Sequence, residues 1–64
     1  MIPVRSSAIT AVGYDPNTQQ MCIQFQQGHS YNFCHVPQYI FDGLLSAGSK
    51  GTYYNDHIRG RYQC

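Results

Sequence analysis

Two runs of alternating residues on either side of Gly28 constrain the fold of this chain most strongly. Within each run every second residue is apolar or aromatic, and the residues between them are polar or small. The alternating positions are Met21, Ile23 and Phe25 before the glycine and His29, Tyr31, Phe33 and His35 after it. A period of two is typical of a half-buried strand, so the pattern predicts a β-hairpin with one apolar face.

The length of the loop decides which residues of the hairpin face each other. A three-residue loop of Gln26–Gly28 places glycine at the left-handed position of a bulged turn. In that register Ile23 pairs with Tyr31, and Met21 pairs with Phe33. A two-residue loop would set the aromatic residues opposite polar ones and mix the two faces. We therefore expect the longer loop, with both aromatic residues of the second strand in the core.

The segments around the hairpin predict one more strand and two helices. Ser6–Asp15 is rich in small and β-branched residues and runs into the turn signal DPNTQ. After the hairpin, residues 37–48 carry apolar side chains at helical spacing and end in a glycine. Ser49 is typical of an N-cap for a second helix that reaches about Arg59. The prediction is one α+β domain of residues 1–64, a three-stranded antiparallel meander followed by two short helices packed on its apolar face.

The size of the chain and its cysteines bear on how such a domain is stabilised. A chain of 64 residues buries only about 60% of its unfolded surface, so its core provides little stability. Self-association would bury more surface, and we therefore expect a homo-oligomer. The three cysteines are odd in number and form no close pair, which argues against a disulfide framework and a structural zinc site. Cys22 and Cys34 would lie on a diagonal of the hairpin, roughly 7 to 8 Å apart, too far for a comfortable bridge.

Charge and residue placement exclude several functions. No segment has the ~20 apolar residues of a membrane span. Together with cysteines that are expected to stay reduced, this predicts a cytoplasmic protein. A net charge of +1 is too small for a protein that coats duplex DNA. The carboxylates Asp15, Asp42 and Asp56 are not placed as an acid and base pair, and Cys34 and His35 would point to opposite faces of a strand. We expect no catalysis, no metal and no cofactor.

The second helix and the residues after it hold the candidate ligand site. Its stacking rings, amide and cations suit a nucleotide, because bases stack on aromatic rings and guanidinium groups fit phosphate. The candidate residues are Lys50, Tyr53, Asn55, His57, Arg59, Arg61 and Tyr62. Two alternatives stay open: Ser49 caps a helix and its neighbouring lysine is only solvated, and the tyrosines form a dimer contact.

Gly60 follows the last residue of the second predicted helix. Helices often end in a residue with positive φ, and glycine adopts that conformation without a penalty from a β-carbon. We therefore expect Gly60 at positive φ. If that turn also directs Arg61 back beside Arg59, a change at Gly60 is expected to weaken ligand binding.

These segments together resemble the KTSC domain. The resemblance rests on SSAITAVGYD, on the phenylalanine and glycine of the hairpin loop, on Tyr31, Phe33 and VP after it, and on LLSAGSKGTYYNDHIRGRY, and it covers Ser6–Tyr62. One departure is Phe33, where the family has the second tyrosine of a Tyr-x-Tyr motif. The family occurs at the C-terminus of some lysyl-tRNA synthetases and alone in bacteria and phages, which implies an RNA-facing role.

Three hypotheses follow for the function. The first is a non-catalytic oligomer that binds a nucleotide-type, phosphorylated small molecule, and in a phage such a protein would suit sequestration of a host nucleotide signal. The second is a module for single-stranded RNA or tRNA, with Tyr31 and Phe33 as a stacking platform on the sheet. The third is a protein-interaction module that offers the edge of its short sheet for strand addition.

Overall fold

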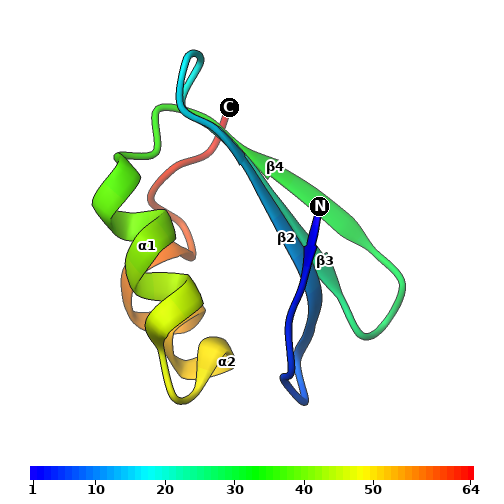
Figure 1. Ribbon diagram of the computed structural model, residues 1–64. Helices are drawn as coiled ribbons and strands as arrows, with labels where there is room; N and C mark the ends of the chain where they lie inside the picture. The colour runs from blue at the N-terminus through cyan, green and yellow to red at the C-terminus, as the bar shows by residue number, and fades with distance from the viewer.

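The computed structural model describes all 64 residues and has an antiparallel sheet with helices on one of its faces (Figure 1). The strands follow in chain order, β1-β2-β3-β4. The elements are β1 (Ile2–Pro3), β2 (Ile9–Asp15), β3 (Gln20–Phe25), β4 (Ser30–Phe33), α1 (Gln38–Ser46), α2 (Lys50–Tyr53) and the π-helix η1 (Tyr54–Ile58). The α+β class and the two-helix layer are confirmed, while the expected number of strands was wrong.

The additional strand is β1, at the edge of the sheet. Ile2 lies opposite Val12 and Pro3 opposite Ala11, and the backbone N–H of Val4 donates to the carbonyl oxygen of Thr10 at 3.0 Å. Two residues are too few to show a period of two, and proline disfavours a strand reading except at an edge. The strand forms because β2 presents a free edge to it.

The core lies between the sheet and the helices, and the hairpin register is the expected one. Ile23 pairs with Tyr31 and Met21 with Phe33, and Gly28 has φ +94°. The buried core residues are Ile9, Val12, Met21, Ile23, Phe33, Val36, Ile40, Phe41, Leu44 and Ile58. Strands and helices both contribute to this cluster, so the helices bury the apolar face of the sheet as predicted.

Tyr31 corrects part of the predicted core. Its side chain is 54% exposed, whereas Phe33 on the same strand is buried. The loop end of the β3–β4 hairpin projects away from the helices (Figure 1), so the helical layer covers only the other end of β4. Strand periodicity predicts the face of the sheet on which a residue lies, but not how far the covering layer extends.

The second helix begins as predicted and then changes type. The hydroxyl oxygen of Ser49 accepts a hydrogen bond from the backbone N–H of Thr52, which caps α2. From Tyr54 the chain forms a π turn, in which the N–H of Arg59 donates to the carbonyl oxygen of Tyr54 at 2.9 Å. Gly60 then has φ +74°, so its predicted conformation is confirmed.

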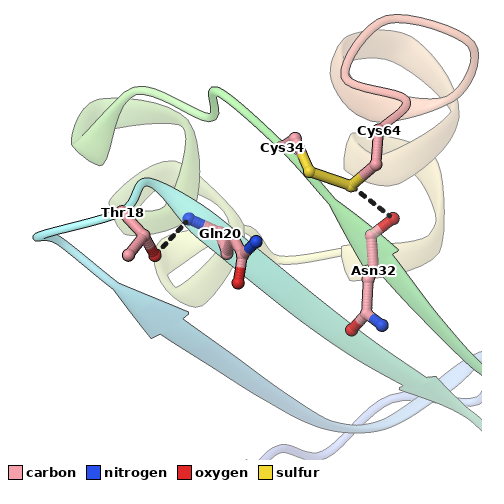
Figure 2. The surroundings of a disulfide bond; sticks show 5 residues. All are labelled: Thr18, Gln20, Asn32, Cys34 and Cys64. Carbon is pink, nitrogen blue, oxygen red and sulfur yellow. Dashed lines mark hydrogen bonds between the residues drawn. A yellow bond between two sulfur atoms is a disulfide. The ribbon is translucent and has the colours of Figure 1, made fainter.

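A disulfide joins Cys34 to Cys64, with a Cα–Cα distance of 4.9 Å (Figure 2). The chain after η1 returns along β4, where the N–H of Cys34 donates to the carbonyl oxygen of Tyr62 at 2.8 Å and Phe33 bridges to Gln63. Cys22 is the free cysteine. The expectation that the chain forms no disulfide was wrong, because only this return brings residue 64 beside the end of β4.

Candidate functional site

An open groove of about 410 Å³ lies between the loop end of the β3–β4 hairpin and η1. We call it the hairpin groove. Its lining residues are Phe25, Gln27, His29, Tyr31, Tyr54 and Arg59. They come from two strands, one loop and the π turn, so the groove exists only in the folded chain.

Aromatic rings in edge-to-face contact form one side of the hairpin groove. The centroid of the Phe25 ring lies 5.6 Å from that of Tyr31 and 5.1 Å from that of Tyr54, with interplanar angles of 71° and 75°. The Tyr54 ring also contacts the buried ring of Phe33, at 6.1 Å and 68°. Edge-to-face pairs of this kind are favourable arrangements of aromatic rings, so these contacts hold the rings in place.

The π turn explains how Arg59 reaches the same groove as Tyr54. In an α-helix of 3.6 residues per turn, residues five apart lie about 140° apart around the axis. A π turn closes with a hydrogen bond between residues five apart, which brings the later residue round to nearly the same side. The bond from the N–H of Arg59 to the oxygen of Tyr54 therefore lets both side chains line one groove.

The polar groups at the groove favour a negatively charged ligand. Arg59 and His29 are both exposed, and none of the lining residues is an aspartate or glutamate. The left-handed Gly28 closes the turn that carries His29, whose carbonyl oxygen accepts a hydrogen bond from the N–H of Phe25 at 2.9 Å. The groove thus combines aromatic surface with one permanent positive charge and one histidine.

The predicted site residues divide into separate groups in the structure. Only Arg59 lines the hairpin groove. Lys50 donates from Nζ to the carbonyl oxygen of Ala47 at 3.0 Å, beside the end of α1. Asn55 and Arg61 are exposed and line neither cavity. The structure therefore does not bring the predicted set together around one ligand.

Of the other predicted residues, Tyr53 contacts α1. The hydroxyl of Tyr53 donates to the carbonyl oxygen of Ile40 at 3.0 Å, and its ring lies 4.5 Å from that of His57. Tyr62 is half-buried against the core. Burial raises the pKa of Tyr53, and the nearby Tyr62 and Tyr39 add to the increase. Tyr53 therefore helps to join the two helices, a role that a helical pattern does not reveal.

Sequence reasoning missed most of the groove residues, although one signal was present. The stacking-platform hypothesis named Tyr31 and Phe33 as base contacts on the sheet. Tyr31 is exposed, whereas Phe33 is buried, so the second residue of that platform was wrong. Phe25 was expected on the apolar face of its strand, and the rings of Phe25 and Tyr54 do pack partly against the core. The sequence offers no signal for Gln27 and His29, which line the groove from the hairpin loop.

A second, smaller hollow of about 220 Å³ lies near the other end of β2 and β3. Its lining residues are Gly13, Tyr14, Asp15, Gln20, Met21, Cys22 and Asn32. It includes a carboxylate and only one aromatic residue, so it lacks the stacking surface of the hairpin groove.

None of the helices has the length and apolar character needed to cross a membrane.

Comparisons with known proteins agree with the resemblance found in the sequence. The family model for the KTSC domain matches residues 5–62. A protein of Tsukamurella paurometabola is 43% identical over 63 residues, which cover 98% of this chain and 94% of the relative. A lysine–tRNA ligase of Nostoc sp. is 32% identical over 63 residues, which cover 98% of this chain but 11% of the ligase. The crystal structure of a KTSC domain protein from Yersinia pestis matches with a TM-score of 0.93 and 37% identity, over 97% of this chain and 87% of that one.

Proposed function

This chain belongs to the KTSC domain family, and from that premise we propose that it is a non-catalytic binding module whose hairpin groove holds a nucleotide-type ligand. The observation that carries the proposal is the meeting of three aromatic rings with Arg59 in one open groove. Aromatic rings contribute about 1 to 3 kcal/mol per stacked base. A guanidinium group adds paired hydrogen bonds to phosphate.

The charges of the groove limit the ligand to few phosphate groups. Arg59 is the one permanent cation among the lining residues, and His29 adds a second positive charge only when it is protonated. No carboxylate is present there to hold the magnesium ion that accompanies a triphosphate. The ligand class that fits is a nucleoside monophosphate, or a single nucleotide step of a longer chain.

The groove is open, so a bound nucleotide would be covered on one side only. The proposal therefore includes self-association, with a second copy of the domain closing over the ligand. Mass measurement in native buffer, with and without nucleotide, tests this part. A monomer under both conditions at ligand saturation overturns the oligomer but leaves the groove as the binding site.

Two arginines close together in sequence provide a matched test of the groove. Arg59→Gln removes a groove cation, and Arg61→Gln removes a cation of the same charge that lies outside it. Calorimetry with the four ribonucleoside monophosphates is expected to show at least about tenfold weaker binding for the first variant, since a charged hydrogen bond contributes about 1.5 to 3 kcal/mol. The second variant should bind like the parent. No heat with any member of the panel overturns the proposal.

Single-stranded RNA is the second candidate, favoured by the exposure of Tyr31 at the sheet surface and by relatives named lysine–tRNA ligase. The two candidates differ in their response to salt. A strand that spans several cations gives a log–log slope against salt of about −0.7 per neutralised phosphate, hence at most about −2 to −3 per subunit. Titration of an oligoribonucleotide from low to high salt distinguishes them, because the groove alone engages about one phosphate and gives a shallow slope.

A further inference from the structure

The Cys34–Cys64 disulfide encloses the whole helical layer. The two cysteines are 30 residues apart, and α1, α2 and η1 all lie between them. The bond connects the end of β4 directly to the segment that follows η1 (Figure 2). Any change in this bond therefore acts on the attachment of the helices to the sheet.

The noncovalent contacts that hold the same segment are few. One hydrogen bond joins the N–H of Cys34 to Tyr62, one bridge joins Phe33 to Gln63, and the N–H of Arg61 donates to Ile58 at 3.0 Å. Residues 59–61 and 63–64 are exposed and Tyr62 packs partly against the core, so only one side chain after Arg59 secures the segment by apolar contact. The disulfide is the strongest link between this segment and the sheet.

The bond is accessible to a reductant. Cys64 is exposed and Cys34 is half-buried, and thiol–disulfide exchange requires that an attacking thiolate reach one of the two sulfur atoms. The carbonyl oxygen of Asn32 lies 3.7 Å from the sulfur of Cys64 (Figure 2).

We propose that the Cys34–Cys64 bond is a redox latch, which a dithiol reductant opens to release residues 61–64 from β4 and loosen η1. A thiolate of the reductant attacks the sulfur of Cys64 and breaks the S–S bond, forming a mixed disulfide while Cys34 leaves as a thiolate and takes up a proton. The second thiol of the reductant then displaces Cys64. Two electrons and two protons pass to the protein, which ends with two thiols, and the reductant becomes a disulfide.

Opening the disulfide is also expected to affect ligand binding in the hairpin groove, an inference that rests on the proposed function. Arg59 lies between the buried Ile58 and the segment that the disulfide holds. In the oxidised protein the backbone of Arg59 is restrained on both sides. In the reduced protein only the side toward Ile58 is restrained, so the guanidinium group is held less firmly and binds phosphate less well.

The first experiment tests the latch without any ligand. In the oxidised protein, iodoacetamide should add to Cys22 alone, and after dithiothreitol it should add to all three cysteines, as read by intact mass. Reduction should lower the melting temperature by roughly 15 °C or more, from the loop-closure entropy of about 30 residues. It should also remove hydrogen-exchange protection from the amide of Cys34. Alkylation of all three cysteines before reduction, or equal melting and exchange in both states, overturns the proposal.

Serine variants identify the cysteines responsible. Cys22→Ser should keep the full response to dithiothreitol, and Cys64→Ser should lose the response and melt like the reduced parent. A Cys64→Ser variant that still responds would overturn the assignment. If the variant does not fold, the reduced and oxidised parent proteins supply the same comparison.

The second experiment tests the link to the groove. Calorimetry with the tightest-binding ribonucleoside monophosphate should show a several-fold loss of affinity on reduction at a temperature where both states are folded, and equal affinity overturns the link. If the oxidised protein binds no nucleotide, the proposed function fails while the melting and exchange results still decide the latch.

Discussion

Tyr53 of α2 packs so closely over Gly43 of α1 that a β-carbon at residue 43 would lie 2.8 Å from the Cζ atom of the phenol ring. The tyrosine cannot easily withdraw, because its hydroxyl donates to the carbonyl oxygen of Ile40. The two helices can approach this closely because Gly43 has no side chain and the Tyr53 ring occupies the space where a β-carbon would lie.

Gly43→Ala should destabilise the domain by about 1 to 3 kcal/mol, the usual cost of overpacking a close contact. Chemical denaturation of the oxidised protein measures this change. In a Tyr53→Ala background the same substitution should cost far less, since the ring that it overlaps is gone. Equal costs in the two backgrounds would show that the contact does not limit the approach of the helices.

Tyr53→Phe should lower stability by about 0.5 to 1.5 kcal/mol through the lost hydrogen bond to Ile40. It should also change the alkaline limit of stability. The pKa of Tyr53 is raised by burial, so the neutral phenol contributes to the stability of the folded state. This contribution is fully present below the ordinary tyrosine pKa of about 10 and is lost as pH rises through the higher pKa of the folded state. Denaturation from pH 8 to 11 should show a smaller alkaline loss in the variant, and curves that run parallel would contradict the prediction.

Tyr31→Ala tests the stacking surface of the hairpin groove. Removing this exposed ring should weaken nucleotide binding by about 1 to 3 kcal/mol, the contribution of one stacked base, and should cost at most about 1 kcal/mol of stability from the lost contact with Phe25. Tyr39 is a matched control, because it is 70% exposed and lies outside the groove. Calorimetry should find Tyr39→Ala unchanged, and a similar loss in both variants would indicate a nonspecific effect.

Gly60→Val should cost on the order of 1 to 2 kcal/mol, because a β-carbon is penalised at its φ of +74°. Gly48→Val supplies the control. A β-carbon there meets nothing within 4 Å and the residue does not have a left-handed φ, so its cost should stay within about 0.5 kcal/mol. Thermal or urea unfolding of the two variants gives the comparison. The turn at Gly60 also restrains the backbone next to Arg59, so a folded Gly60→Val variant should bind nucleotide less well, and unchanged affinity would separate the turn from the site.

The parts of the fold that were predictable depend on neighbours in the sequence. Alternation gave the correct hairpin register, and the chemistry of Ser49 and Gly60 gave a cap and a left-handed turn that the structure confirms. Each of these features is decided within a few residues by sterics or by one local hydrogen bond. The family resemblance, which spans nearly the whole chain, is likewise confirmed.

The parts that were missed depend on segments far apart in the chain. The disulfide requires Cys64 to return beside β4, and the exposure of Tyr31 depends on where the helices stop covering the sheet. The place of Arg59 in the groove depends on a π turn, which a helical wheel of 3.6 residues per turn does not represent. These features follow from packing, and no local pattern encodes them. Absence of catalysis, the cytoplasmic location and the nucleotide ligand stay predictions.

Both edges of the sheet carry a feature that opposes aggregation. On β1, Pro3 has no amide hydrogen, and because the neighbouring N–H of Val4 points toward β2, the missing donor of Pro3 is on the outer side of the sheet. On β4, residues 62–64 already occupy part of the outer edge. Unpaired edges invite strands of other molecules to add to them. The oxidised domain is thus protected from edge-to-edge growth into fibrils, while a reduced preparation at high concentration should aggregate sooner.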